Sequence, residues 1–313
     1  MKEKCLKNKK TPSQSNPWKQ HKIALIMLIP ALLTVFIFNY IPLAGLVIAF
    51  KDYDVFKGII GSPWVGFENF RIIFDKPEML KAIYNSLIYG LTITFVGFPF
   101  PIILALLFNE LRNARFKKVV QTISYMPHFL SWASIVSLFY AFFASEGSFN
   151  MIMAKIVGEG YEPVNILMDS KYFLGIIFGS HLWKSVGWES VVYLAAITGI
   201  DSSLYEAASI DGCSKFKQAF YITLPMIRNT AVILLVMSLG GIVATNFEQV
   251  YGFQNVFIQE DTETINTLIY REGIQNGKYS LATAFGLSQG LVTLLLVLSA
   301  NFISKKLMKV SIW

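Results

Sequence analysis

Six long apolar blocks dominate this chain and restrict what it can fold into. They span Ile23–Phe50, Ile83–Phe108, Val119–Phe143, Phe173–Ile200, Thr230–Val250 and Leu281–Ile303. A helix needs about 20 mostly apolar residues to cross the hydrocarbon core of a bilayer, and each block is long enough. Only 15% of the residues are charged and the mean hydropathy is +0.51, which leaves too little polar material to cover a soluble globule. We therefore predict an all-α membrane protein with six transmembrane helices.

The distribution of Lys and Arg predicts the orientation of these helices. The N-terminal tail, the second and fourth connections and the C-terminal segment carry 17 of these residues, against 9 in the other three connections. Because positive charge favours the cytoplasmic side, both termini are expected in the cytoplasm. The first block is too long for a signal sequence, so we expect it to be retained as a helix.

This topology also predicts the domain organisation. We expect a flexible cytoplasmic tail at residues 1–22, a transmembrane domain at residues 23–313, and within it a cytoplasmic loop at residues 201–228. The net charge of +7 follows from the basic loops on one membrane face, so nucleic acid is not an expected partner, whereas membrane lipids are. Cys5 and Cys213 both fall on the reducing cytoplasmic side, and no disulfide is expected.

Patterns that suggest catalysis do not fit their context. The stretch Gly273–Lys278 is one residue too short for a phosphate-binding loop and lacks the following Ser or Thr. Gly286-Leu-Ser-Gln-Gly290 matches a nucleophile elbow, but it lies inside an apolar block, where two glycines four residues apart favour close helix packing. The three histidines lie in separate segments and form no metal-ligand cluster. We predict no catalytic residue and no metal site.

The longest moderately polar segment of the second half, EAASIDGCSKFKQAFYITLP from Glu206 to Pro225, lies in the predicted cytoplasmic loop. Ser203 and Glu206 have the spacing of a capping box and predict a helix that begins at Ser203. Asp211-Gly212 predicts a turn, a second helix follows from about Ser214, and Pro225 marks the approach to the fifth span. These features suit either a docking element or an amphipathic linker on the membrane surface.

This loop resembles the signature of permease subunits of ABC importers, which reads EAA, three residues, Gly, nine residues and I-x-L-P. The matching residues are Glu206, Ala207, Ala208, Gly212, Ile222, Leu224 and Pro225. The resemblance implies a type I ABC importer permease fold, in which the loop is a coupling helix that docks on a separate ATPase. It also implies that this chain is not an enzyme and binds no cofactor, with ATP and Mg held by the partner ATPase.

Other segments are similar to the carbohydrate-uptake permeases of the oligosaccharide and polysaccharide type, which includes the maltose permeases. They are Trp64–Phe70, Tyr125–Ser131, Gly187-Trp188 and Tyr193–Ala196. This likeness implies a multi-pass protein of the bacterial cytoplasmic membrane that imports an oligosaccharide. The implied partners are a second homologous permease, an ATPase dimer and an extracytoplasmic sugar-binding protein.

Polar residues inside the fourth and fifth blocks are candidates for a substrate path. His181, Lys184 and Trp188 share one helix face in the fourth block, and Ser238, Thr245 and Gln249 share one in the fifth, with Asn246 beside them. By resemblance, the path is lined by Lys184, Ser185, Trp188, Ser238 and Asn246. A mid-membrane ammonium should face a cavity or an acidic partner, and Glu248 is a better candidate partner for Lys184 than Glu189.

Several alternatives stay open at this point. Trp188 is either a path residue or a packing aromatic, and Lys184 with Glu248 is either part of the path or a buried pair between helices. If Lys184 faces the path unpaired, an acidic oligosaccharide is the expected cargo. The competing functions are an ABC importer permease for a non-sugar solute and a membrane sensor or scaffold.

Overall fold

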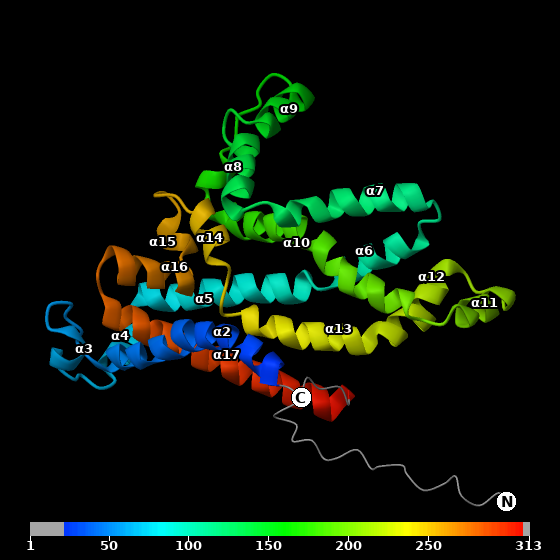
Figure 1. Cartoon of the computed structure of the whole chain (residues 1–313). Helices are drawn as coiled ribbons and strands as arrows, with labels where there is room; N and C mark the ends of the chain where they lie inside the picture. Colours follow the sequence, from blue (N-terminus) through cyan, green and yellow to red (C-terminus); the bar gives the residue numbers. More distant parts are fainter. Residues whose placement is uncertain (1–21, 309–313) are drawn as a thin grey trace, which may run out of the picture.

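The computed structural model describes residues 22–308, so the predicted tail at residues 1–22 lies outside the described residues except for Lys22. This part of the chain is helical, and its one β-pairing is an isolated bridge between Lys51 and Trp64. The all-α prediction is confirmed. Long helices make up most of the molecule, and shorter helical segments connect them (Figure 1).

Within residues 22–308, five helical stretches are long and apolar enough to cross a membrane: Leu25–Phe50, Pro77–Glu110, Trp132–Val157, Lys215–Gly241 and Tyr279–Lys306. The block predicted at Phe173–Ile200 forms a continuous 26-residue helix, α10 (Phe173–Thr198). This helix is not among the five, because Lys184, Glu189 and several small polar residues dilute its apolar content.

The remaining elements follow in chain order. The N-terminal half contains α2 (Lys22–Val35), η1 (Phe36–Tyr40), η2 (Ile41–Phe50), α3 (Gly58–Gly61), α4 (Glu68–Asp75), α5 (Pro77–Leu91), η3 (Thr92–Val96), α6 (Pro99–Glu110), α7 (Ala114–Tyr125), η4 (Met126–Phe129), α8 (Trp132–Phe143), α9 (Ser148–Val157), η5 (Ile166–Met168) and η6 (Ser170–Tyr172). After α10 come α11 (Ser202–Ile210), α12 (Lys215–Gln218), η7 (Ala219–Thr223), α13 (Leu224–Ser238), η8 (Leu239–Gly241), α14 (Phe247–Phe253), α15 (Gln259–Thr262), α16 (Ile265–Tyr270), η9 (Arg271–Gln275) and α17 (Tyr279–Met308).

Two of the predicted spans are not continuous helices, which corrects the sequence-based expectation. The block at Val119–Phe143 is interrupted between α7 and α8, where Pro127 lies in a 3₁₀ turn and Ser131 caps the next helix. The block at Thr230–Val250 is interrupted between α13 and α14, after Gly240-Gly241, and Asn246 caps α14. Proline and glycine disfavour the helix interior, and each break is followed by a strong N-cap residue.

The helices pack into one layered body with two distinct ends. α2, α5, α13 and α17 run roughly parallel, while α8 and α9 project away from them (Figure 1). One apolar cluster joins η2, α4, α5, α16 and α17, a second joins α5, α8, α10 and α14, and a third joins α6, α10 and α13. α11, α12 and the α6–α7 connection lie at one end, and α3 and α4 lie at the opposite end (Figure 1).

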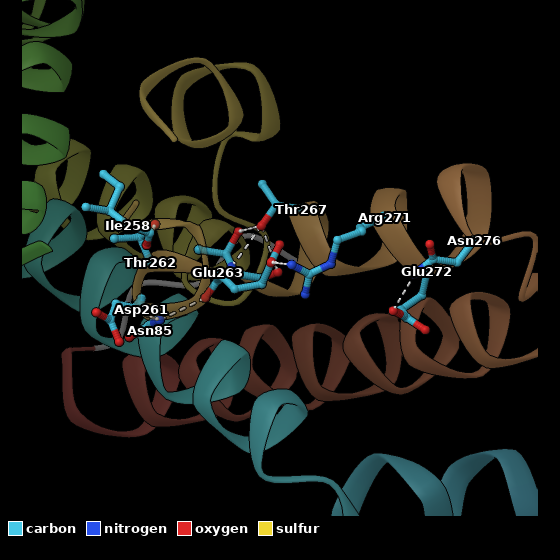
Figure 2. A network of polar contacts seen from close by, with 10 residues as sticks. Asn85, Ile258, Asp261, Thr262, Glu263, Thr267, Arg271, Glu272 and Asn276 are labelled. Carbon is cyan, nitrogen blue, oxygen red and sulfur yellow. Dashed lines mark hydrogen bonds and ion pairs between the residues drawn. The ribbon is translucent and has the colours of Figure 1, made fainter. Parts of the chain in front are cut away.

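A polar network fixes the connection after α14 onto α5 (Figure 2). Asn85 of α5 donates its side-chain amide to the carbonyls of Asp261 (2.8 Å) and Glu263 (2.9 Å). Lys81 binds the Asp261 carboxylate at 2.5 Å, and this contact holds the pKa of Asp261 below its usual range. Arg271 pairs with Glu263, whose side chain is only 4% exposed, at 2.5 Å. The segment before α17 is therefore rigidly attached to the helical body.

Removing the charge of Arg271 should destabilise the protein, because the buried Glu263 carboxylate would lose its counter-charge. We expect Arg271→Met to cost roughly 3 kcal/mol, the low end for breaking a buried pair, since the Arg271 side chain is a quarter exposed. Thermal unfolding of the purified protein in detergent measures this. Lys57→Met is the matched control, because Lys57 and Asp54 form an exposed pair. Equal melting temperatures for the two variants would contradict the role given to Glu263.

Gly187 is required where α10 crosses α7. A Cβ atom at Gly187 would lie 1.9 Å from the carbonyl oxygen of Ser124, whereas one at Gly179 on the same helix would meet nothing within 4 Å. We expect Gly187→Ala to separate the two helices and to lower stability by about 1–3 kcal/mol, the usual cost of overpacking. Gly179→Ala should be neutral or slightly stabilising, since alanine favours the helix. A thermal melt that ranks Gly179→Ala below Gly187→Ala would show this packing to be wrong.

Candidate functional site

A cavity of about 500 Å³ lies between the α5–α6 bend, α10 and the break between α13 and α14. Its aromatic lining includes Trp188 and Tyr193. Its polar lining consists of Thr94, His181, Glu189, Ser238, Thr245, Asn246 and Gln249. A mostly apolar hollow with a few polar groups is the usual form of a small-molecule site.

The helix break at Ile242–Asn246 shapes this cavity. A Cβ atom at Gly90 would lie 1.9 Å from the Ile242 carbonyl oxygen, so α5 approaches the break at a distance that only glycine permits. Gln249 donates its side-chain amide to the Ile177 carbonyl (2.7 Å) and to the Ser180 hydroxyl (2.9 Å). α14 is thereby attached to α10, and the break is held open beside the cavity.

Three of the predicted path residues line the cavity: Trp188, Ser238 and Asn246. Lys184, Ser185 and Glu248 are not among the residues that line it. The shared helix face predicted for Ser238 and Gln249 is wrong, because they lie on separate helices, although both reach the cavity.

The Lys184 ammonium makes hydrogen bonds to backbone carbonyls. It donates to the carbonyl of His128 at 2.9 Å and to that of Leu130, and it lies 5.4 Å from the centre of the Trp132 ring. Among the described residues it makes no direct ion pair with Glu248, so the buried pair, one of the two alternatives left open by the sequence, is not formed as a direct contact. The physical reason is that the break between α7 and α8 leaves carbonyls without helical partners, and the ammonium satisfies them.

Glu189 also lines the cavity, although the sequence did not single it out as a path residue. It was considered only as a partner for Lys184, from which it points away along the helix. The cavity-lining positions of α10 are 181, 182, 188, 189, 192 and 193, which form one continuous helix face. Helical periodicity counted from Trp188, and not from Lys184, would have identified Glu189 as a cavity residue.

The predicted cytoplasmic loop folds into two short helices. Asp201 caps α11 by accepting from the Ser203 backbone N–H (2.9 Å), so the predicted capping box of Ser203 and Glu206 is wrong and the helix begins at Ser202. The Asp201 carboxylate accepts hydrogen bonds from the backbone and from the side chain of Ser203, and these hold the pKa of Asp201 below its usual range. The predicted turn is confirmed, with Gly212 at φ +74°, and Ser214 caps α12 as expected.

Side chains hold the two arms of this loop together. The Tyr205 hydroxyl lies 2.8 Å from the Thr223 hydroxyl, and the buried Gln218 donates to the Ser209 hydroxyl at 2.9 Å. The outer surface is different in character, because Glu206, Ala207 and Ile210 are exposed, the last at 86%. An apolar tip on a braced loop, at one end of the molecule, is a surface suited to a protein partner (Figure 1).

These features together define a class of protein: a helical membrane permease with a cavity at helix breaks and an exposed helical loop at one end. Residues 78–309 match the family described as "Binding-protein-dependent transport system inner membrane component", and the chain belongs to that family. It is accordingly a multi-pass permease component of an ABC transporter in the inner membrane. In such transporters the nucleotide binds a separate ATPase subunit.

Relatives of this chain share nearly its full length. The polygalacturonan/rhamnogalacturonan transport system permease protein YteP of Bacillus subtilis is 39% identical over 287 residues, covering 92% of this chain and 89% of that protein. Protein LplB of Bacillus subtilis is 38% identical over 92% of this chain and 90% of its own length. A subunit in the crystal structure of a bacterial alginate ABC transporter, bound to an alginate pentasaccharide-loaded periplasmic protein, is similar at 35% identity. It has a TM-score of 0.86, with 95% of this chain and 98% of that chain covered.

Gly212 is the residue on which the loop turn depends. Its positive φ is unfavourable for any residue with a Cβ atom, by roughly 1–2 kcal/mol. We expect Gly212→Ala to loosen the turn and to speed hydrogen exchange at the Cys213 amide, which donates to the Ala208 carbonyl (2.9 Å). Gly199→Ala at φ −81° is the control and should leave that amide unchanged. Unaltered exchange in Gly212→Ala would mean that the turn is not under this constraint.

Proposed function

We propose that this chain forms half of the gated pathway of an ATP-driven importer of oligosaccharides derived from a polysaccharide. In this proposal it has six transmembrane helices with both termini in the cytoplasm, and α10, the fourth in chain order, is counted with the five apolar stretches. Its partners are a second homologous permease, an ATPase dimer and an extracytoplasmic sugar-binding protein. The observation that carries the proposal is the likeness, over 92–95% of the chain, to permeases whose names refer to acidic polysaccharides.

The α11–α12 loop is proposed to dock on the ATPase. Glu206 and Ala207 are exposed on α11 and would enter a groove of the ATPase, with the half-buried Ala208 beside them, and Gly212 permits the reversal into α12. Leu224 and Pro225 begin α13, so a movement of the loop passes directly into a helix that borders the cavity. The braces made by Tyr205 and Gln218 support this role, because a loose loop would absorb the movement.

The cavity is proposed to be this subunit's part of the sugar path. Trp188 offers a flat apolar surface, and Ser238 and Asn246 offer hydroxyl and amide groups, which match the C–H faces and hydroxyls of a sugar. Ser185 and Glu248 are proposed to border the path without facing this cavity. Ser238 and Asn246 lie at the break between α13 and α14, where non-helical main chain lines the cavity, and Trp188 lines the same cavity from the continuous helix α10.

Uptake by the reconstituted importer tests the proposal. The chain is assembled with the second permease, the ATPase and the binding protein in liposomes, and entry of labelled oligogalacturonides and alginate oligosaccharides is measured. We expect entry that requires ATP and the binding protein, and that stops when the ATPase carries a substitution that prevents hydrolysis. ATP-dependent entry of a non-sugar solute with neither sugar transported would refute the proposed cargo, and no ATP-dependent entry of any solute would refute import.

A further inference from the structure

The two faces of the Trp188 ring have different surroundings. One face is covered by the His128 imidazole, which stacks on it at 4.8 Å between centroids and 8° between planes. Phe129 meets the ring edge-on at 5.6 Å. The indole remains 45% exposed and lines the cavity. Its orientation toward the cavity is therefore set by the residues of the α7–α8 break.

His128 is held by its backbone more than by its side chain. Its Nδ1 atom is buried and, within the described residues, makes no hydrogen bond. The position of the ring thus depends on stacking and on the 3₁₀ turn Met126–Phe129 that carries it. That turn has few bonds of its own, since it is short and is followed at once by the cap of α8 at Ser131.

Lys184 secures this turn. Its ammonium donates to the carbonyls of His128 and Leu130, and it lies over the face of Trp132. An ammonium has three donors, and two of them are directed at the turn. Lys184 and Trp188 lie one helical turn apart on α10. Lys184 therefore binds the main chain of the segment at residues 126–130, while the His128 imidazole of the same segment covers Trp188.

We propose that Lys184 is a positioning residue that, through His128, orients Trp188 as a stacking platform for a sugar ring. On this basis the subunit recognises the C–H face of the sugar and not its carboxylate. The inference rests on the proposed function and names the chemistry that the same cavity recognises. It replaces the acidic-cargo role that the sequence suggested for Lys184.

The charges around the cavity agree with this assignment. No Lys or Arg is among the described residues that line it, and its one carboxylate, that of Glu189, would repel an acidic sugar. The Lys184 charge is taken up by two carbonyls and an aromatic face. An acidic cargo would therefore meet its counter-charge outside this cavity.

Uptake of a matched pair of probes by the whole reconstituted importer tests the inference. The probes are a galacturonate trimer and its fully methyl-esterified form, which has the same ring faces without negative charge. We expect Lys184→Met to reduce uptake of both by the same factor, roughly three- to tenfold, the range of one aromatic contact. Lys184→Arg should restore most of the uptake, because its guanidinium still donates to the two carbonyls.

Two further variants separate positioning from loss of folding. His128→Ala removes the stacking ring and should match Lys184→Met, whereas His128→Phe keeps a stacking ring and should stay close to wild type. The double variant of Lys184→Met with Trp188→Ala should be no worse than Trp188→Ala alone, since both act on one contact.

Different outcomes overturn different statements. Loss of the charged trimer alone in Lys184→Met would show that Lys184 reads the carboxylate, and additive losses in the double variant would show that it acts apart from Trp188; either overturns the inference and leaves the proposed function intact. Failure of Lys184→Met to assemble, with His128→Ala transporting like wild type, would also overturn it. Absence of ATP-dependent uptake of both probes by the wild-type importer would refute the proposed cargo as well.

Discussion

The structure depends on one constraint of the membrane interior, which is that every backbone N–H and C=O must find a partner inside the protein. Continuous helices meet this constraint by themselves, but this chain interrupts its helices at two places within apolar blocks. Polar side chains then satisfy the freed carbonyls. Lys184 binds those of His128 and Leu130, Asn266 binds that of Thr245 (2.6 Å), and Gln289 binds that of Val243 (3.1 Å).

These interruptions are also what create the cavity. A straight helix through Thr230–Val250 would place Ser238 and Asn246 on different faces of one rod, whereas the break turns Asn246 and Gln249 toward α10. Asn246, which caps α14, and Gln249, which attaches α14 to α10, both line the space in which a substrate is proposed to move. Structural and functional roles share the same few side chains, which explains why intramembrane polarity alone does not separate path residues from packing residues.

The sequence predicted the helical class, most of the apolar segments and the loop turn at Gly212, because these depend on local composition and on local backbone preference. It did not predict what Lys184 binds. The cost of a buried ammonium shows that a partner is needed, but the partner was the main chain of a turn more than 50 residues earlier, exposed by a break at Pro127. The predicted capping box is wrong for a local reason, since Asp201 is an equally good cap and lies two residues before Ser203.

Docking of the α11–α12 loop on an ATPase subunit is tested most directly by the rate at which an impermeant maleimide labels Ile210→Cys in a variant without Cys5 and Cys213. Ile210 is 86% exposed, and Val256, at 91% exposure, provides a control position in the connection after α14. The proposed arrangement predicts that Ile210→Cys reacts only from the cytoplasmic side and is protected when the ATPase binds, while Val256→Cys reacts only from outside and is unaffected. Labelling of Ile210→Cys from outside, or at an unchanged rate with the ATPase bound, would contradict it.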